Sequence, residues 1–207
     1  MKKTTKDKIL TFLKKEVSLT VNDLTERLDI THMAVRKHLN ILEKEELISS
    51  KEVKQPMGRP IQTYLLTEKG ERVFPKNYEG ISMEFLHDIE QLHGEETILQ
   101  LFKQRENRLR LEYSLRLSQK RESLDKMNEI VSIQNEKGYM ANLTQLDEHT
   151  FEMIEYNCPI LEIAKTYKVA CQCETSMFKQ VLKTDHVNRT CCKTDGDNHC
   201  KFLVKFQ

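Results

Sequence analysis

Residues 31–44, THMAVRKHLNILEK, predict an amphipathic helix that starts after Thr31. Val35, Leu39 and Leu42 recur at spacings of four and three residues, which places them on one face of that helix. Thr31 is a typical N-cap residue. The opposite face offers side chains that suit base edges and phosphates in a DNA major groove, although a solvated helix face with ordinary charges has the same pattern. The predicted DNA contacts on this helix are Thr31, His32, Met33, Arg36, Lys37 and Asn40.

The flanking residues complete a DNA-binding pattern. Residues 4–15 and 20–28 predict two earlier helices, the second with Thr20 and Asp23 at capping-box spacing. Residues 47–53 and 61–66 predict two strands, joined by the turn-rich segment KQPMGRP that carries two cations. Three helices followed by a hairpin with a basic tip is the order of a winged helix-turn-helix.

The segments AVRKHLNILEKEELI (34–48), GRP (58–60) and YLLTEKG (64–70) strongly resemble bacterial winged-helix repressors of the ArsR/DeoR-like group. The resemblance covers about residues 5–75 and implies that double-stranded operator DNA is the partner. It also implies that Arg59, in the wing, enters or borders the minor groove. We therefore expect a DNA-binding domain at residues 1–75, where Lys and Arg exceed Asp and Glu by 15 to 11.

Composition narrows the class of protein. The chain has 207 residues and a net charge of +1, so any contact with phosphates must be local. It shows no signal peptide and no apolar run long enough to cross a membrane, which predicts a cytoplasmic protein with reduced thiols. We expect no enzyme, because no Ser-His-Asp order, phosphate loop or paired catalytic carboxylates are visible.

The middle region, residues 76–137, is predicted to be helical. Residues 84–136 lack proline, contain only Gly94 as a glycine and carry apolar residues at roughly helical spacing, which fits one long helix or two. We expect this region to form a homodimer interface, since such repressors read two half-sites through two-fold symmetry. The alternative is a solvated connector that packs only on its own domains.

The last region, residues 138–207, is predicted to be a small domain of mixed strands and helices. Strands are expected at 139–146 and 150–156, and a final hairpin at 186–193 and 201–206. Short helices are expected at 160–167 and 174–182. The predicted fold class is therefore α+β and mainly helical, with a winged helix-turn-helix, a helical dimerisation connector and a small cysteine-containing sensor domain.

All six cysteines lie in this last region, at positions 158, 171, 173, 191, 192 and 200. In a reducing compartment such a group indicates metal ligands or redox thiols more than structural disulfides. The segments NCPI at Cys158, CQCE at Cys171 and GDNHCKF at Cys200 resemble the SufR family, winged-helix repressors of iron–sulfur cluster assembly operons. That family has the sensor pattern C-x12-C-x13-C-x14-C.

The resemblance implies a [4Fe-4S] cluster bound by Cys158, Cys171 and Cys200. Asp185 stands where the pattern has its third cysteine, and its carboxylate would be a harder and weaker ligand for iron than a thiolate. His186 and Cys173 are the alternate ligands. Cys191, Cys192 and His199 are further candidates, and strand alternation predicts that the vicinal cysteines point to opposite faces.

Other sensor chemistries use the same residues. A structural zinc site suits thiolates, but the long spacings lack the short C-x2-C pair of most zinc sites. A metal-free thiol switch or a small-ligand sensor is the other alternative, with Cys173, Cys191 and Cys192 as reactive thiols. The working hypothesis is a dimeric repressor whose cluster senses redox, oxygen or iron status.

Overall fold

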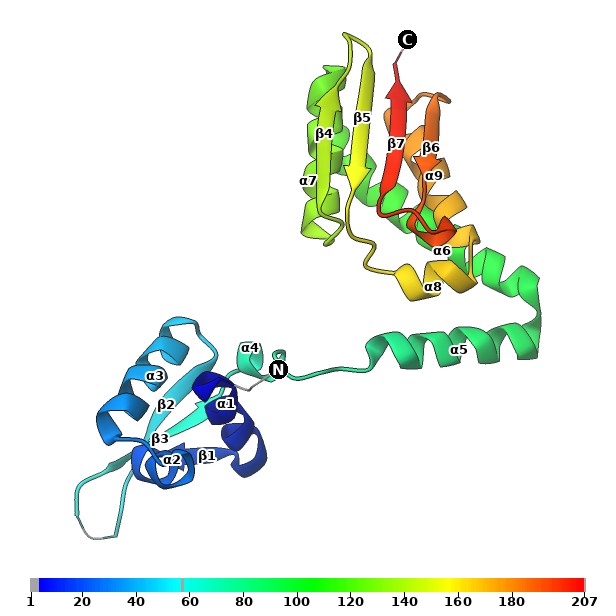
Figure 1. Ribbon diagram of the computed structural model, residues 1–207. Helices are drawn as coiled ribbons and strands as arrows, with labels where there is room; N and C mark the ends of the chain where they lie inside the picture. The colour runs from blue at the N-terminus through cyan, green and yellow to red at the C-terminus, as the bar shows by residue number, and fades with distance from the viewer. Residues whose placement is uncertain (1–3, 57, 207) are drawn as a thin grey trace. The chain divides into compact units, whose positions relative to one another are not determined.

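The computed structural model describes residues 4–56 and 58–206 and divides the chain into two compact units that join between Asn77 and Tyr78. Each unit has its own hydrophobic core. Each unit also has its own antiparallel sheet (Figure 1). Helices make up 56% and strands 18% of the residues that the structure describes, which confirms the predicted α+β, mainly helical class.

The N-terminal unit is a winged helix-turn-helix, as predicted. Its elements are α1 (Thr5–Glu16), β1 (Ser18–Thr20), α2 (Val21–Leu28), α3 (His32–Lys44), β2 (Ile48–Val53), β3 (Ile61–Leu66) and the short α4 (Glu68–Glu71). The strand β1, which the sequence did not predict, pairs with β3 and gives a three-stranded sheet of order β1-β3-β2.

Caps and buried stripes fix the position of α3. The Thr20 hydroxyl accepts a hydrogen bond from the Asp23 amide at 3.2 Å, and the Thr20 amide donates to the Asp23 carboxylate at 2.7 Å, which forms the predicted capping box at the start of α2. Val35, Leu39 and Leu42 are fully buried. The buried stripe orients α3, so its opposite face is open to solvent.

The C-terminal unit is a four-stranded sheet with helices on one face. Its elements are α5 (Tyr78–His93), α6 (Glu95–Leu117), α7 (Ser123–Glu136), β4 (Ala141–Gln145), β5 (Thr150–Glu155), α8 (Leu161–Thr166), α9 (Val169–Leu182), β6 (Val187–Cys191), the 3-10 turn η1 (Lys193–Asp195) and β7 (Cys200–Lys205). The strand order is β4-β5-β7-β6, and every neighbouring pair is antiparallel.

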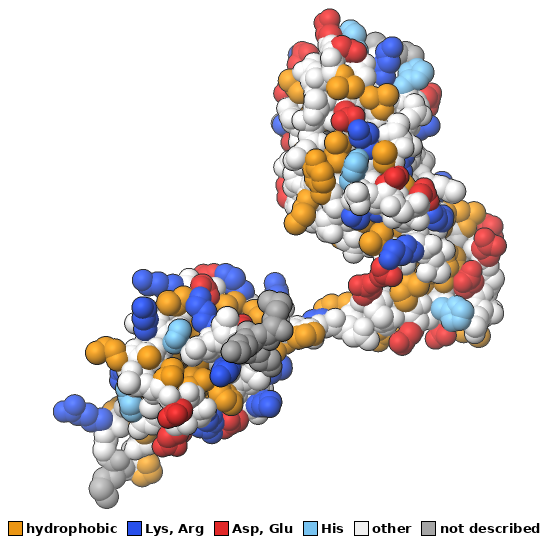
Figure 2. All heavy atoms as spheres, viewed as in Figure 1, with side chains coloured by type: hydrophobic (Ala, Val, Ile, Leu, Met, Phe, Trp, Pro, Cys, Tyr) orange, Lys and Arg blue, Asp and Glu red, His pale blue; other side chains and the backbone are white. Residues whose placement is uncertain are grey.

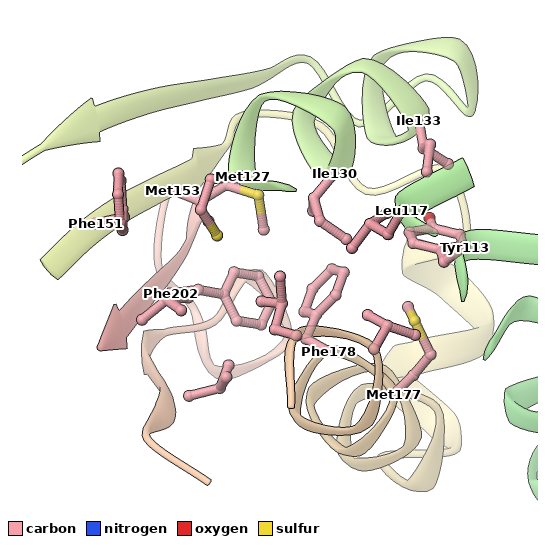
Figure 3. Close-up of a cluster of buried hydrophobic side chains, with 14 of the residues drawn as sticks. Tyr113, Leu117, Met127, Ile130, Ile133, Phe151, Met153, Met177, Phe178 and Phe202 are labelled. Atoms are coloured by element: carbon pink, nitrogen blue, oxygen red, sulfur yellow. The ribbon is translucent and has the colours of Figure 1, made fainter. Parts of the chain in front are cut away.

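One core joins these helices to the sheet. Figure 3 shows Tyr113 and Leu117 of α6, Met127, Ile130 and Ile133 of α7, and Met177 and Phe178 of α9 packed towards Phe151, Met153 and Phe202 of the sheet. The middle of the chain forms three helices instead of one or two. Because α6 and α7 belong to the core of the sheet, residues 78–207 form a single unit without the boundary that the sequence suggested near residue 138.

Two local features differ from the sequence prediction around the cysteines. The helix α9 starts at Val169, so Cys171 and Cys173 lie inside it and do not precede it. The strand β6 contains a bulge, because Arg189 pairs with Phe202 whereas Cys191, two positions on, pairs with the adjacent Lys201. An extra residue in one strand reverses the alternation of its side chains.

Candidate DNA-binding face and cysteine centre

The open face of α3 carries the predicted DNA contacts. Thr31, His32, Met33, Arg36, Lys37 and Asn40 are all exposed. Met33 has 80% of its side chain exposed, which is unusual for a methionine and leaves it free for apolar contact with a thymine methyl group. Thr31 also caps the helix, since its hydroxyl accepts a hydrogen bond from the Ala34 amide at 3.3 Å.

In the described residues, the proposed DNA-contacting cations on α3 and in the wing form no ion pair with a carboxylate. In the described part of the chain, Arg36, Lys37 and Arg59 form no ion pair, whereas Lys6 and Arg27 are paired with Glu45 and Glu16. Arg59 is exposed in the segment between β2 and β3. Figure 2 shows Lys and Arg side chains spread over the visible face of the N-terminal unit. Unpaired guanidinium and ammonium groups are the donors that phosphates and guanine edges require.

In the C-terminal unit, four of the six cysteines gather at one end of the sheet. Cys158 follows β5, Cys171 lies in the first turn of α9, Cys192 follows β6, and Cys200 begins β7. Cys158, Cys171 and Cys200 line one small cavity, and Cys171 and Cys192 line the adjoining, larger one. The sulfur atoms of Cys171 and Cys192 are 4.0 Å apart. All six cysteines are free thiols.

Hydrogen-bond donors surround the Cys192 sulfur. The Thr194 hydroxyl lies 3.1 Å from it, and Nη1 of Arg189 donates to it at 3.5 Å. Burial opposes ionisation of this thiol, but the contacts with Thr194 and Arg189 outweigh it and lower the pKa of Cys192 to about 7. The group is therefore partly a thiolate at neutral pH, the form that binds metals and attacks disulfides.

The other three thiols of the group are held as neutral acids. Burial raises the pKa of Cys171 to about 11 and that of Cys200 to about 12, and it also raises the pKa of Cys158. The backbone amide of Lys193 donates to the Cys200 sulfur at 3.4 Å. A bound cation would reverse this preference, because a coordinating thiol loses its proton.

Buried charges lie behind the cysteines. Arg189 bonds to the Glu174 carboxylate at 2.7 Å and to the Cys171 carbonyl at 3.1 Å, and its guanidinium stacks 4.6 Å from the Phe202 ring centre. Glu155, only 1% exposed, pairs with Cys200 across the sheet. Burial, and then the charge of Glu174, raises the pKa of Glu155 well above its ordinary value.

The structure does not bring Asp185 or His186 to the cysteines. Both are exposed before the start of β6, where they line a separate pocket with Lys126 and Lys183. Cys192 lies at the other end of the strand, and the five residues of β6 alone extend about 16 Å. The expected ligand role of Asp185 and its alternate His186 is therefore corrected: a side chain of either residue is too short to cover that distance.

Cys173 and Cys191 also lie apart from the group. Cys173 lies two positions after Cys171 in α9, so it points to another side of the helix and packs against Ile98 and Phe102 of α6. Burial raises the pKa of Cys173 to about 11. Cys191 pairs with Lys201 on the outer face of the sheet, because the bulge turns Cys192 inward in its place. Strand alternation predicted that only one of the vicinal cysteines points inward, but the bulge that selects Cys192 has no sequence signal.

The donor set fits a thiolate-binding metal better than a carboxylate-binding one. Two thiolates at about 2.3 Å from one tetrahedral metal lie about 3.8 Å apart, close to the 4.0 Å between Cys171 and Cys192. Within residues 4–56 and 58–206, no group of three or more His, Cys, Asp or Glu side chains is already placed around a metal position. Binding of a metal ion therefore requires thiol side chains to rotate. A [4Fe-4S] cluster requires larger rotations than a single ion, because its four ligands bind separate iron atoms.

Comparisons with known proteins identify the N-terminal unit. Residues 4–50 match the family described as "Bacterial regulatory protein, arsR family", so this unit is a helix-turn-helix domain of DNA-binding transcriptional regulators. No curated protein matches the chain. In the described residues, no helix is both long and apolar enough to cross a membrane.

Similar solved structures include a repressor and a protein bound to operator DNA. The adhesin competence repressor AdcR from Streptococcus pyogenes is 21% identical, with a TM-score of 0.29, over 49% of this chain and 75% of that one. PadR from Bacillus subtilis in complex with operator DNA is 15% identical, with a TM-score of 0.29, over 84% of this chain and 93% of that one.

Proposed function

We propose that this regulator is a homodimeric repressor whose C-terminal unit holds a [4Fe-4S] cluster that responds to redox, oxygen or iron–sulfur status. The convergence of Cys158, Cys171, Cys192 and Cys200 from four separate segments carries the proposal. Cys192 takes the place that the sequence pattern gave to Asp185. An all-thiolate set is the usual ligand set of such clusters.

The residues around the thiols would hold the loaded centre in place. Arg189 offsets the negative charge of the thiolates, and its bond to Glu174 fixes it against α9. The Asp197 carboxylate accepts a hydrogen bond from the Cys192 amide at 2.8 Å, which orients the segment after β6. The cluster would supply a redox-active centre that links the four cysteine-bearing segments. Its oxidation would change the charge between these segments, and its loss would also change the distances between them.

A hydrogen-bonded route leads from this centre to α6. Gln134 of α7 donates to the Glu155 carboxylate and accepts a hydrogen bond from the Tyr113 hydroxyl of α6 at 2.5 Å. The helix α6 follows α5 after the single residue Gly94, and α5 starts directly after the DNA-binding unit. A coupling of about 1–3 kcal/mol along this route would change operator affinity about 5- to 150-fold.

The homodimer would form through α5. Tyr78, Ile81, Phe85 and Leu92 are exposed and recur at spacings of three, four and seven residues, as along the seam of a helix pair. Met83, Leu86 and Ile89 of α5 are partly buried and pack against its own unit. A charge in the middle of the exposed stripe, Phe85→Glu, should give a monomer in sedimentation, whereas His87→Glu, away from the stripe, should not.

Metal analysis tests the cluster. Protein purified without oxygen should contain iron and sulfide, and Cys192→Ser should lose both. The neighbouring Cys191→Ser and the exposed Asp185→Ala are matched controls that should retain them. If Cys192→Ser keeps its iron while Asp185→Ala loses it, the ligand set proposed here is wrong.

A single zinc ion is the second candidate. The 4.0 Å between Cys171 and Cys192 favours it, because this distance suits two ligands of one tetrahedral metal. Zinc analysis of the same preparations separates the two: one zinc per chain without sulfide replaces the cluster. If the protein contains neither iron nor zinc and its operator binding still changes with oxidants, a metal-free thiol switch is the remaining explanation.

A further inference from the structure

A cavity of about 580 Å³ opens beside the cysteine centre, between α9 and the segment that follows β6. This volume lies within the range of small-molecule sites. Its walls include Gln172, Thr175 and Ser176 of α9, and Thr194 lies on the opposite side. The walls thus offer hydroxyl and amide groups to a polar ligand.

Two thiols face this cavity. Cys171 and Cys192 line it, whereas Cys158 and Cys200 line only the smaller cavity behind. Their sulfur atoms are 4.0 Å apart, so the two sulfur atoms must approach by about 2 Å to form an S–S bond. Arg189 and Thr194 contact the Cys192 sulfur, so both can stabilise negative charge on it during a reaction.

The charged groups that line the cavity are mainly cationic. Lys168, Lys179 and Arg189 face it, and Asp195 is the one carboxylate among its lining residues. Lys168 is paired with Asp195, and Arg189 with Glu174. The Lys179 ammonium group forms no hydrogen bond or ion pair within the described part of the chain. A ligand that enters is therefore expected to carry negative charge near its reactive atom.

We propose that this cavity admits an anionic low-molecular-mass disulfide, which oxidises Cys171 and Cys192 in the metal-free protein. The proposal extends the proposed function in one respect: the same two thiols serve as metal ligands and as the reacting pair. Metal loading and disulfide exchange are therefore alternative states of the centre.

The reaction has two exchange steps. The Cys192 thiolate attacks one sulfur of R–S–S–R, so a Cys192–S–S–R bond forms, the original S–S bond breaks and RS⁻ leaves. Cys171 then attacks the Cys192 sulfur, gives its proton to the leaving thiolate or to water, and releases a second RS⁻. The protein loses two electrons, and the small disulfide is reduced to two thiols.

The test uses the full-length, chelated and reduced protein with two probes. Glutathione disulfide is anionic, and bis(2-hydroxyethyl) disulfide is neutral. Intact-mass spectrometry should show loss of two hydrogens in the wild type, with the bond between Cys171 and Cys192 in the peptide map. Cys171→Ser should stop at one mixed disulfide, located on Cys192.

Charge selectivity is the decisive readout. Lys179→Gln should slow reaction with the anionic probe about threefold, as expected for two unit charges about 7 Å apart in water, and leave the neutral probe unaffected. Lys126→Gln, which lines the other pocket, is the matched control and should change neither rate. Equal loss with both probes, or an adduct on Cys191 or Cys173, would overturn the proposal.

The metal assays separate this proposal from the proposed function. Lys179→Gln should bind as much metal as the wild type, because it supplies no ligand. If the wild type never binds metal but reacts at Cys192, only the proposed cluster function is contradicted. A metal-loaded protein whose chelated form does not react with either probe would contradict the exchange alone.

Discussion

Replacing Phe178 by alanine should destabilise the C-terminal unit and leave the DNA-binding unit unchanged. Phe178 of α9 is 1% exposed and lies between the rings of Tyr113 on α6 and Phe202 on β7, at centroid distances of 6.4 Å and 5.1 Å (Figure 3). The ring thus connects a helix that precedes the sheet in sequence to its central strands. Its removal leaves a cavity that three elements line.

The magnitude follows from the burial. An aromatic side chain removes at least about 150 Å² from water, which at about 25 cal/mol per Å² corresponds to about 4 kcal/mol. This value lies within the range of about 3–5 kcal/mol for Phe→Ala in cores. For a unit of this size, the melting temperature should fall by about 12–15 °C.

Calorimetry of the full chain measures both units at once. The transition of the C-terminal unit should shift, while that of the winged helix should not. Leu146→Ala is the control in the same unit, because its side chain is 54% exposed and should cost little. If Phe178→Ala lowers the free energy of unfolding of the C-terminal unit by less than about 1 kcal/mol, the Phe178 ring is not buried in the core as described. Equal shifts of both transitions would refute the independence of the two cores.

Four further predictions concern the DNA-binding unit. Arg36→Ala should weaken specific operator binding by about 1–3 kcal/mol, and more than non-specific binding, in fluorescence anisotropy; equal losses would mean that Arg36 contacts only phosphate. Gly70→Ala should unfold this unit at lower urea, because an added Cβ would lie 2.0 Å from the Leu47 carbonyl oxygen, a backbone atom that no rotamer change can move; an unchanged midpoint would contradict that contact. Thr20→Ala should cost about 1 kcal/mol through loss of the cap. The backbone and hydroxyl of Thr20 hold the pKa of Asp23 below its ordinary value of 3.8, so its stabilisation is complete above that pH and is lost as pH falls through the lowered pKa. The free energy of unfolding of Asp23→Asn, measured by urea titration at several pH values, should therefore fall less steeply at acid pH than that of the wild type.

The DNA-binding unit was largely predictable because its local signals agree. The segment IQTYLL (61–66), after the turn-rich tip, predicted β3 with the bounds that the structure has, and the Thr20–Asp23 spacing predicted a cap that forms. The missing element, β1, is a three-residue strand whose pairing with β3 depends on residues 43 to 47 positions later in the chain. No local pattern contains that information.

The cysteine centre was predictable only in part. Spacing and family resemblance selected Cys158, Cys171 and Cys200, which line one cavity in the structure. The prediction of Asp185 as the fourth ligand failed because spacing along the chain does not show at which end of a strand a residue lies. Asp185 and Cys192 lie at opposite ends of β6, and a bulge that depends on pairing with β7 selects which vicinal cysteine points inward.

The helix α6 carries residues of two separate clusters in the C-terminal unit. Ile98 and Phe102 pack with α8 and the start of α9, whereas Tyr113 and Leu117 pack with α7 and the sheet. One extra residue between Phe102 and Tyr113 would rotate one end of α6 by about 100° relative to the other. Relatives of this unit should therefore differ in length at the loops around residues 118–122 and 146–149 and keep α6 at constant length. An insertion inside it would keep the two clusters on their present faces only as nearly whole turns, of which seven residues, about two turns, is the shortest that restores the phase to within about 20°.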